Sequence, residues 1–205
     1  MIAFDREYYE QGPMTGKSLY TNYRWLPELT LPLAHHIAMD CNLDKHQSIC
    51  DFGCAKGYLV YALQLLGYDS YGVDISEYAI SKAPKEVNGH VTCIEPLTKF
   101  GYYSWIICKD ILEHIPYEDI EKQLYLLSNS CRFMMVMVPL GDGEKYFIEA
   151  YEKDVTHVIR ENLDWWINLF VIAGFKIVKA SYEMGPYKEN WQIHPIGNGL
   201  FMLET

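Results

Sequence analysis

The chain has 205 residues, of which 50% are hydrophobic and 21% are charged, and its formal net charge is −10. This size and composition predict one globular domain with a substantial core. The acidic balance argues against a nucleic-acid-binding face, and no apolar run reaches the roughly 20 residues that a membrane span requires. Six cysteines without a C-x-x-C pair, and no visible signal peptide, favour reduced thiols in a cytoplasmic protein.

The first 47 residues are rich in aromatic side chains and precede the first predicted strand. Residues 12–18, GPMTGKS, look like a phosphate-binding loop, but their spacing is one residue short and no apolar strand leads into them. Residues 26–39 predict one or two helices, interrupted at Pro27 and Pro32 because proline disrupts a helix interior. Packing of the aromatic side chains against the sheet face is one role open to this segment.

Residues 48–76 predict a β-turn-α-β unit. A strand ends at Asp51, a turn carries Gly53 and Gly57, a helix covers 57–66, and a second strand ends at Asp74. Such a unit lets a helix N-terminus and bare backbone approach a ligand at the carboxyl end of a sheet. Asp74 follows Gly53 by 21 positions, near the roughly 20-residue offset at which an acidic side chain can bind a ribose. The pattern predicts a nucleoside-containing cofactor.

The glycine spacing narrows the choice of cofactor. A dinucleotide fingerprint needs glycine where Ala55 and Tyr58 stand, which disfavours a nicotinamide cofactor. Residues 51–57, DFGCAKG, instead resemble the first motif of class I S-adenosylmethionine-dependent methyltransferases, whose usual form is acidic-x-Gly-x-Gly-x-Gly. Ala55 departs from that form. A doubly wound sheet with tight turns and no ligand is the alternative.

This resemblance implies a set of cofactor-binding residues. In that family the turn holds the methionine half of S-adenosylmethionine, and the acid that ends the second strand holds the ribose hydroxyls. Carried over to this sequence, the implied contacts are Asp51, Gly53, Cys54, Ala55, Gly57, Asp74 and Ile75.

A short helix over 77–82, with Ser76 as its N-cap, and a third strand over 90–94 continue the alternation. In the resembling family, the residues after this strand flank the adenine, often with a carboxylate toward its amine. Ile94 and Glu95 are the candidates. A solvated loop charge is the alternative role for Glu95.

The fourth predicted strand, 105–109, is followed by DILEHI at 110–115, a phrase common in the same methyltransferase superfamily. The resemblance implies that Lys109 contacts the cofactor through its backbone. His114 is a candidate catalytic base, because histidine ordinarily titrates near neutral pH. Anchoring the adjacent helix is its alternative role.

A helix over 117–128 and a buried strand over 133–139 lead into an inserted segment, 144–160. Within it, Asp154 and His157 resemble the D-x-x-H element of many small-molecule methyltransferases. His157 is therefore a candidate base that deprotonates an acceptor hydroxyl, oriented by a carboxylate such as Asp154 or Glu149. A brace for the loop is the alternative.

A helix over 162–173, closed by Gly174, and strands over 175–182 and 199–204 complete the pattern. The predicted fold class is α/β: a Rossmann-like, doubly wound seven-stranded sheet, mostly parallel with an antiparallel C-terminal strand, and helices on both faces. Residues 1–47 resemble the lid of small-molecule methyltransferases, and residues 48–205 form the cofactor-binding domain, within a single domain overall.

The predicted function is transfer of a methyl group from S-adenosylmethionine to a small polar acceptor, with a sugar or polysaccharide precursor as one candidate. A macromolecule methyltransferase and a non-catalytic module that holds the cofactor are the alternatives. We predict no metal, because Asp110 lacks evident second and third ligands and no Cys/His pattern suggests zinc. We expect no membrane partner, and a homodimer is an open arrangement.

Overall fold

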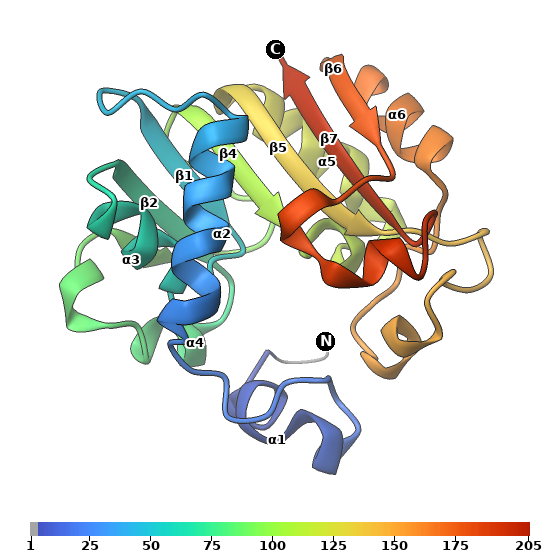
Figure 1. The fold of residues 1–205 in the computed structure, drawn as a ribbon, viewed down its shortest axis with the longest axis horizontal. Helices are drawn as coiled ribbons and strands as arrows, with labels where there is room; N and C mark the ends of the chain where they lie inside the picture. The colour runs from blue at the N-terminus through green and yellow to red at the C-terminus, as the bar shows by residue number, and fades with distance from the viewer. Residues whose placement is uncertain (1–3) are drawn as a thin grey trace. The chain divides into compact units, whose positions relative to one another are not determined.

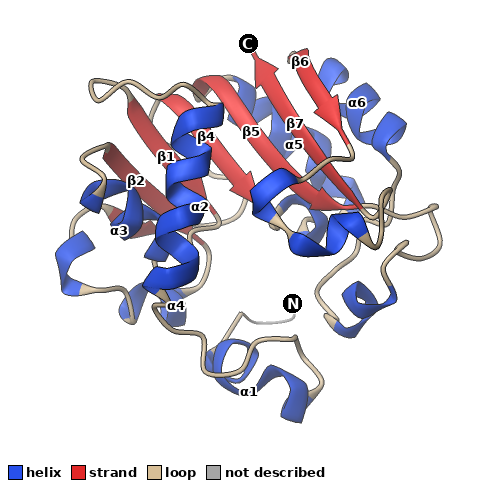
Figure 2. Cartoon of the chain, in the orientation of Figure 1, coloured by secondary structure: helices blue, strands red, loops and turns tan. Residues whose placement is uncertain are grey.

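The computed structural model describes residues 4–205 and divides into two compact units, Met1–Pro96 and Leu97–Thr205. Figure 1 follows the chain from blue at the N-terminus to red at the C-terminus, and Figure 2 shows helices beside the strands of each unit. The first unit contains α1 (Arg6–Thr15), α2 (Pro27–Asp40), β1 (Ser48–Phe52), α3 (Tyr58–Leu65), β2 (Asp69–Asp74), α4 (Glu77–Ser81), the 3-10 helix η1 (Lys85–Val87) and β3 (Val91–Cys93).

In the first unit, β1 and β3 flank β2, and all three strands are parallel. The apolar side chains of β1 are buried, with Ile49 and Cys50 fully so, and Val73 of β2 is also buried, as expected of parallel strands covered by helices. The edge strand β3 is more exposed. Phe52 pairs with Val73, and the N–H groups of Gly53 and Cys54 both donate to the Val73 carbonyl. This register places the turn after β1 beside Asp74, the last residue of β2.

The second unit contains β4 (Tyr103–Lys109), η2 (Leu112–His114), α5 (Tyr117–Ser128), β5 (Cys131–Pro139), η3 (Glu149–Lys153), α6 (Leu163–Ile172), β6 (Lys176–Ser181), η4 (Gly185–Tyr187), η5 (Glu189–Gln192) and β7 (Asn198–Glu204). β4 and β5 are parallel, and β7 runs antiparallel between β5 and β6. The helices α5 and α6 contact each other and pack on β5 and β6 respectively. The seven strands, mostly parallel with an antiparallel C-terminal strand, confirm the predicted fold class.

Helix ends follow the capping residues of the sequence. The Ser76 hydroxyl accepts the Ala79 N–H at 3.0 Å and begins α4, as predicted. The Asn162 side chain likewise accepts the Trp165 N–H at 2.9 Å and begins α6. Gly174 follows α6 with φ +97°, a left-handed conformation that glycine adopts at low cost.

The N-terminal segment differs from the sequence prediction in two ways. Residues 26–39 predict one or two helices interrupted at the prolines, and the structure has one uninterrupted helix, α2. Pro27 lies in its first turn, where a missing N–H costs nothing, and Pro32 lies inside it. The second difference is α1, which the sequence did not suggest and which includes part of the phosphate-loop-like run. Among the described helices, none combines the length and apolar character that crossing a membrane needs.

Candidate active site

The turn after β1 has an unusual backbone. Gly53, Ala55 and Gly57 all have positive φ, at 81°, 49° and 73°. At Gly57 a Cβ would also lie 2.9 Å from Cγ1 of Val91, so close packing as well as conformation requires glycine. Ala55 carries its methyl group in the left-handed region, which costs about 1–2 kcal/mol. Alanine in place of the motif's glycine therefore leaves the conformation of the turn in place and adds local strain to it.

Asp74 holds this turn in place. It is 7% exposed, its Oδ2 accepts the Ala55 N–H at 2.7 Å, and its Oδ1 accepts the Ser76 N–H at 2.7 Å. Burial raises the pKa of Asp74, and the N–H groups of Ser76, Ala55 and Ile75 partly oppose that rise. Each carboxylate oxygen has a further lone pair, so the side chain can also accept hydrogen bonds from a ligand's hydroxyl groups.

The other predicted cofactor residues of the first unit lie at the same strand ends. Asp51 and Cys54 are buried, Ile75 is 41% exposed, and Ile94 follows β3 and donates its N–H to the Asp74 carbonyl at 2.9 Å. Glu95 is exposed. The structure thus gathers nine of the ten predicted residues at the carboxyl ends of β1, β2 and β3, and their contact with a cofactor stays a prediction. The tenth, Lys109, ends β4 in the second unit and forms an ion pair with Asp110 at 2.5 Å.

The aromatic N-terminal segment packs against this turn. Buried Lys56 donates to the Glu10 carboxylate at 2.5 Å and to the Tyr23 carbonyl at 2.6 Å. Tyr8 and Tyr9 form a buried cluster with Ala79, against which Ala55 also packs. No role for Lys56 could be predicted from the sequence, because its ion-pair partner lies 46 positions earlier. A cavity of about 560 Å³ beside α1, lined by Arg6, Glu10, Gln11, Asn22, Tyr78 and Lys82, includes none of the predicted site residues.

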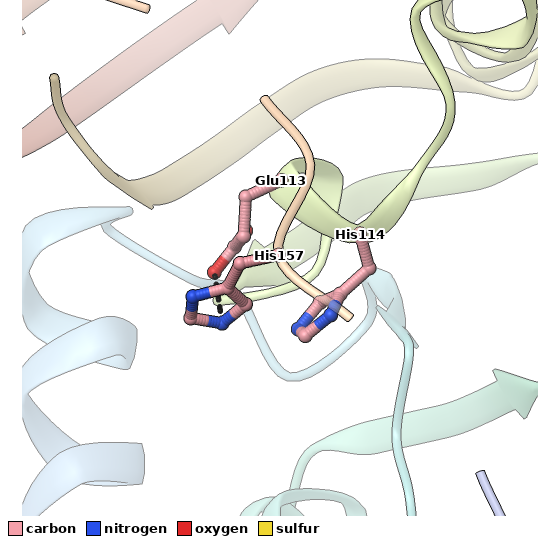
Figure 3. Close-up of side chains that lie close together, drawn as sticks. All are labelled: Glu113, His114 and His157. Atoms are coloured by element: carbon pink, nitrogen blue, oxygen red, sulfur yellow. Dashed lines mark ion pairs between the residues drawn. The ribbon is translucent and has the colours of Figure 1, made fainter. Parts of the chain in front are cut away.

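In the second unit, Glu113, His114 and His157 lie together (Figure 3). The two imidazole centroids are 4.7 Å apart. Nδ1 of His157 lies 2.9 Å from the Tyr151 carbonyl and donates to it, while its Nε2 lies 4.0 Å from Glu113 Oε1 and 4.0 Å from an Asp154 oxygen. The Tyr151 carbonyl therefore orients His157, where the sequence suggested Asp154 or Glu149.

A second chain of hydrogen bonds orients His114. The Thr156 hydroxyl donates to Asp154 Oδ1 at 2.5 Å and lies 2.7 Å from His114 Nδ1. Since the hydroxyl proton points to Asp154, Nδ1–H of His114 is the donor to Thr156. Burial, aided by the neighbouring His157, lowers the pKa of His114 to about 4, and burial also lowers the pKa of His157. Both rings are neutral near pH 7, with the lone pair on Nε2.

Glu113 is the buried member of this cluster. It is 1% exposed, and its Oε2 has no hydrogen-bond partner. Burial, reinforced by the negative charge of Asp110, raises the pKa of Glu113 well above its usual value. Its backbone carbonyl accepts the N–H groups of Val158 and Ile159 at 2.8 and 3.1 Å, which attaches the inserted segment to η2. Glu113 belongs to the DILEHI motif, but no separate role for it was predicted from the sequence.

A polar network lies at the end of β4. Asp110 has a positive φ of 53° and pairs with Lys188 at 2.5 Å. Burial alone would raise the pKa of Asp110, but the two ammonium groups of Lys109 and Lys188 hold it below its usual range. Lys188 also donates to Asn198 Oδ1 at 3.0 Å and to the Tyr151 hydroxyl at 3.3 Å. The sequence analysis missed Lys188, because it lies in an irregular loop without a motif.

Comparison with known proteins gives one family and one fold. A family model described as a methyltransferase domain matches residues 24–180. A SAM-dependent methyltransferase from Archaeoglobus fulgidus superposes with a TM-score of 0.65 at 15% identity, covering 87% of this chain and 97% of that one. Magnesium protoporphyrin IX methyltransferase from Synechocystis PCC 6803, with bound SAH, superposes with a TM-score of 0.63 at 18% identity. The match covers 86% of this chain and 82% of that one.

A structure described as a [4+2]-cyclase is also similar, with a TM-score of 0.64 at 10% identity, covering 85% of this chain and 81% of the cyclase. The search of curated proteins found no match. The shared fold thus extends over most of this chain, although the identities are low.

Proposed function

This chain belongs to the methyltransferase domain family, and on that premise we propose that it transfers a methyl group from S-adenosylmethionine to a small polar acceptor. The membership confirms the methyltransferase class predicted from the sequence. The similar structure with bound SAH supports the predicted cofactor. The observation that carries the proposal is the hydrogen bond from the Ala55 N–H to Asp74, which joins the turn after β1 to the acid that ends β2.

The first unit supplies the groups that hold the cofactor. Asp74 accepts the ribose hydroxyls, the turn at residues 53–57 carries the methionine half, and Ile94 with Glu95 lies beside the adenine. Positive φ at Gly53 and Gly57 keeps Cβ atoms off the turn, which supports a close approach of the ligand to the backbone. Bound S-adenosylmethionine supplies an electrophilic methyl group.

The second unit supplies the base. His157 is neutral near pH 7, and the Tyr151 carbonyl fixes its proton on Nδ1, so Nε2 can accept the proton of an acceptor hydroxyl. His114 has the same protonation state and lies beside it. These two histidines remain the candidate catalytic residues.

A small polar acceptor fits the chemistry of the second unit. Lys188 and Tyr151, which are half-buried, place an ammonium group and a hydroxyl next to the segment that carries His157, and such groups bind hydroxylated molecules. The net charge of −10 disfavours a nucleic acid. A sugar or polysaccharide precursor stays a candidate, as do a cytoplasmic location and a homodimer. Within residues 4–205 the six cysteines form no disulfide, which supports the location.

A second hypothesis is that the chain binds the cofactor without transferring its methyl group. The similar [4+2]-cyclase supports it, because one fold can serve different reactions. Incubation with methyl-labelled S-adenosylmethionine and a panel of hydroxylated small molecules, with transfer RNA and bulk protein as alternatives, separates these readings. Label in a small acceptor supports the proposal. Label only in a macromolecule, or retained cofactor without transfer to any acceptor, overturns it.

The role of His157 is tested by His157→Ala. We expect turnover to fall far more than affinity for S-adenosylhomocysteine, because the side chain acts on the acceptor. His194→Ala is the matched control, since His194 is exposed. Full activity of the His157 variant would leave it only a bracing role.

A further inference from the structure

We propose that Glu113, His114 and His157 form a binding site for a divalent transition-metal ion such as Zn²⁺. One potential ligand atom from each residue lies within 4.8 Å of the other two, and Figure 3 shows the Glu113 carboxylate next to the His157 ring, with the His114 ring on the other side of His157. The sequence predicts no metal, because Asp110 has no evident second and third ligands. The cluster arises only when the fold brings His157 to Glu113, 44 positions earlier.

The spacing suits an ion after a small contraction. Around a tetrahedral ion with bonds of about 2.1 Å, two ligand atoms lie about 3.4 Å apart. Nε2 of His157 and Oε1 of Glu113 are 4.0 Å apart, so this pair needs to close by about 0.6 Å. The pairs with His114 lie within 4.8 Å, so they need to close by at most about 1.4 Å. Side-chain rotation can supply such a change without moving the backbone.

An independent observation is the unsatisfied carboxylate. Oε2 of Glu113 has no hydrogen-bond partner, although the residue is 1% exposed. Buried polar atoms nearly always have a hydrogen-bond partner or bind an ion, because an unpaired buried oxygen is costly. Oε1 is the oxygen nearer His157, so a cation that both carboxylate oxygens bind would also satisfy Oε2.

The surrounding hydrogen bonds are those that metal ligands need. Histidine ligands usually donate their other ring N–H to a carbonyl or carboxylate, which fixes ring orientation and tautomer. His157 donates to the Tyr151 carbonyl at 2.9 Å. His114 lies 2.7 Å from Thr156, which donates to Asp154. Both rings are therefore held with their lone pairs on Nε2, the form that binds a metal.

The ligand set indicates which ion. Two imidazoles and one carboxylate favour Zn²⁺ and its first-row neighbours over Mg²⁺, which prefers oxygen ligands. Three protein ligands also leave a coordination position open, as in catalytic zinc sites. In a role that rests on the proposed function, an acceptor hydroxyl would bind there and release its proton to water more easily. His157 would then act as a ligand, and not as the base.

Calorimetric titration of the chelator-treated, dialysed full chain with Zn²⁺ tests the site. We expect one ion per chain, and at least about tenfold weaker binding in Glu113→Gln and in His157→Ala, because each loses a ligand. His194→Ala, which removes an exposed histidine, should bind as the parent does. Titration with Co²⁺ should give visible absorption bands typical of nitrogen and oxygen ligands, and these should vanish in the Glu113 and His157 variants.

Failure to bind Zn²⁺, or equal binding by the parent and both variants, would overturn the metal site. If circular dichroism shows that one variant is unfolded, the other variant and the Co²⁺ spectrum of the parent decide. S-adenosylhomocysteine affinity is measured on the same samples. If the folded parent binds S-adenosylhomocysteine but not Zn²⁺, the metal site alone is refuted. If the folded parent does not bind S-adenosylhomocysteine, the proposed function is refuted.

Discussion

Replacing Asp74 with asparagine should weaken binding of S-adenosylhomocysteine by about ten- to a hundredfold. A hydrogen bond to a charged group contributes about 1.5–3 kcal/mol, and each 1.4 kcal/mol is about tenfold in affinity. In the structure both Asp74 oxygens already accept backbone N–H groups at 2.7 Å, from Ala55 and Ser76. Asparagine keeps one of these acceptors and turns an NH₂ group toward the other donor. We therefore expect the free energy of unfolding to fall as well, by about 1–3 kcal/mol.

Calorimetry measures the affinity, at a temperature where circular dichroism shows parent and variant to be folded. Glu77→Gln is the matched control, because it removes a carboxylate three residues away that is exposed. The control should bind as the parent does. Unchanged affinity of a folded Asp74→Asn variant would refute the assignment of Asp74 to the ribose.

The remaining predictions concern the turn, the N-terminal segment and the network at β4. Ala55→Gly should raise the free energy of unfolding by about 0.5–1 kcal/mol, because glycine relieves the left-handed strain. Gly57→Ala should lower it by at least about 1 kcal/mol. Urea titration measures both, and a lower free energy of unfolding in Ala55→Gly would contradict the strain. Lys56→Met breaks the buried ion pair with Glu10, so limited proteolysis should cut the segment before residue 27 faster than in the parent. An equal rate would contradict the claim that this ion pair attaches the segment. Lys188→Met should lower the free energy of unfolding by about 1–3 kcal/mol at neutral pH. The pKa of Asp110 is lower in the folded state, so its stabilisation is present above the unfolded value of about 3.9 and is lost as the pH falls below it. The cost of Lys188→Met should therefore shrink in acid, and a constant difference across the pH range would contradict the ion pair.

The parts of the fold that sequence could predict depend on contacts close along the chain. The turn after β1 and Asp74 are about 20 positions apart, and a single β-α-β unit fixes their approach. The helix over 117–128 agreed with α5 at both ends, because its apolar positions recur at helical spacing.

The parts that could not be predicted depend on distant contacts. Glu113 meets His157 only through the inserted segment, whose backbone bonds to η2 have no periodic signal in the sequence. Lys188 reaches Asp110 from a loop 78 positions later. The strain at Ala55 was also hidden, because alanine carries no propensity for positive φ and only the packed turn imposes it.

A crystal structure of the chain grown with S-adenosylhomocysteine tests the central claim most directly. We expect the ribose hydroxyls within hydrogen-bond distance of the Asp74 carboxylate, and the homocysteine part over the backbone of residues 53–57. A structure in which that turn is empty at saturating ligand, or in which the nucleoside binds elsewhere, would contradict the account.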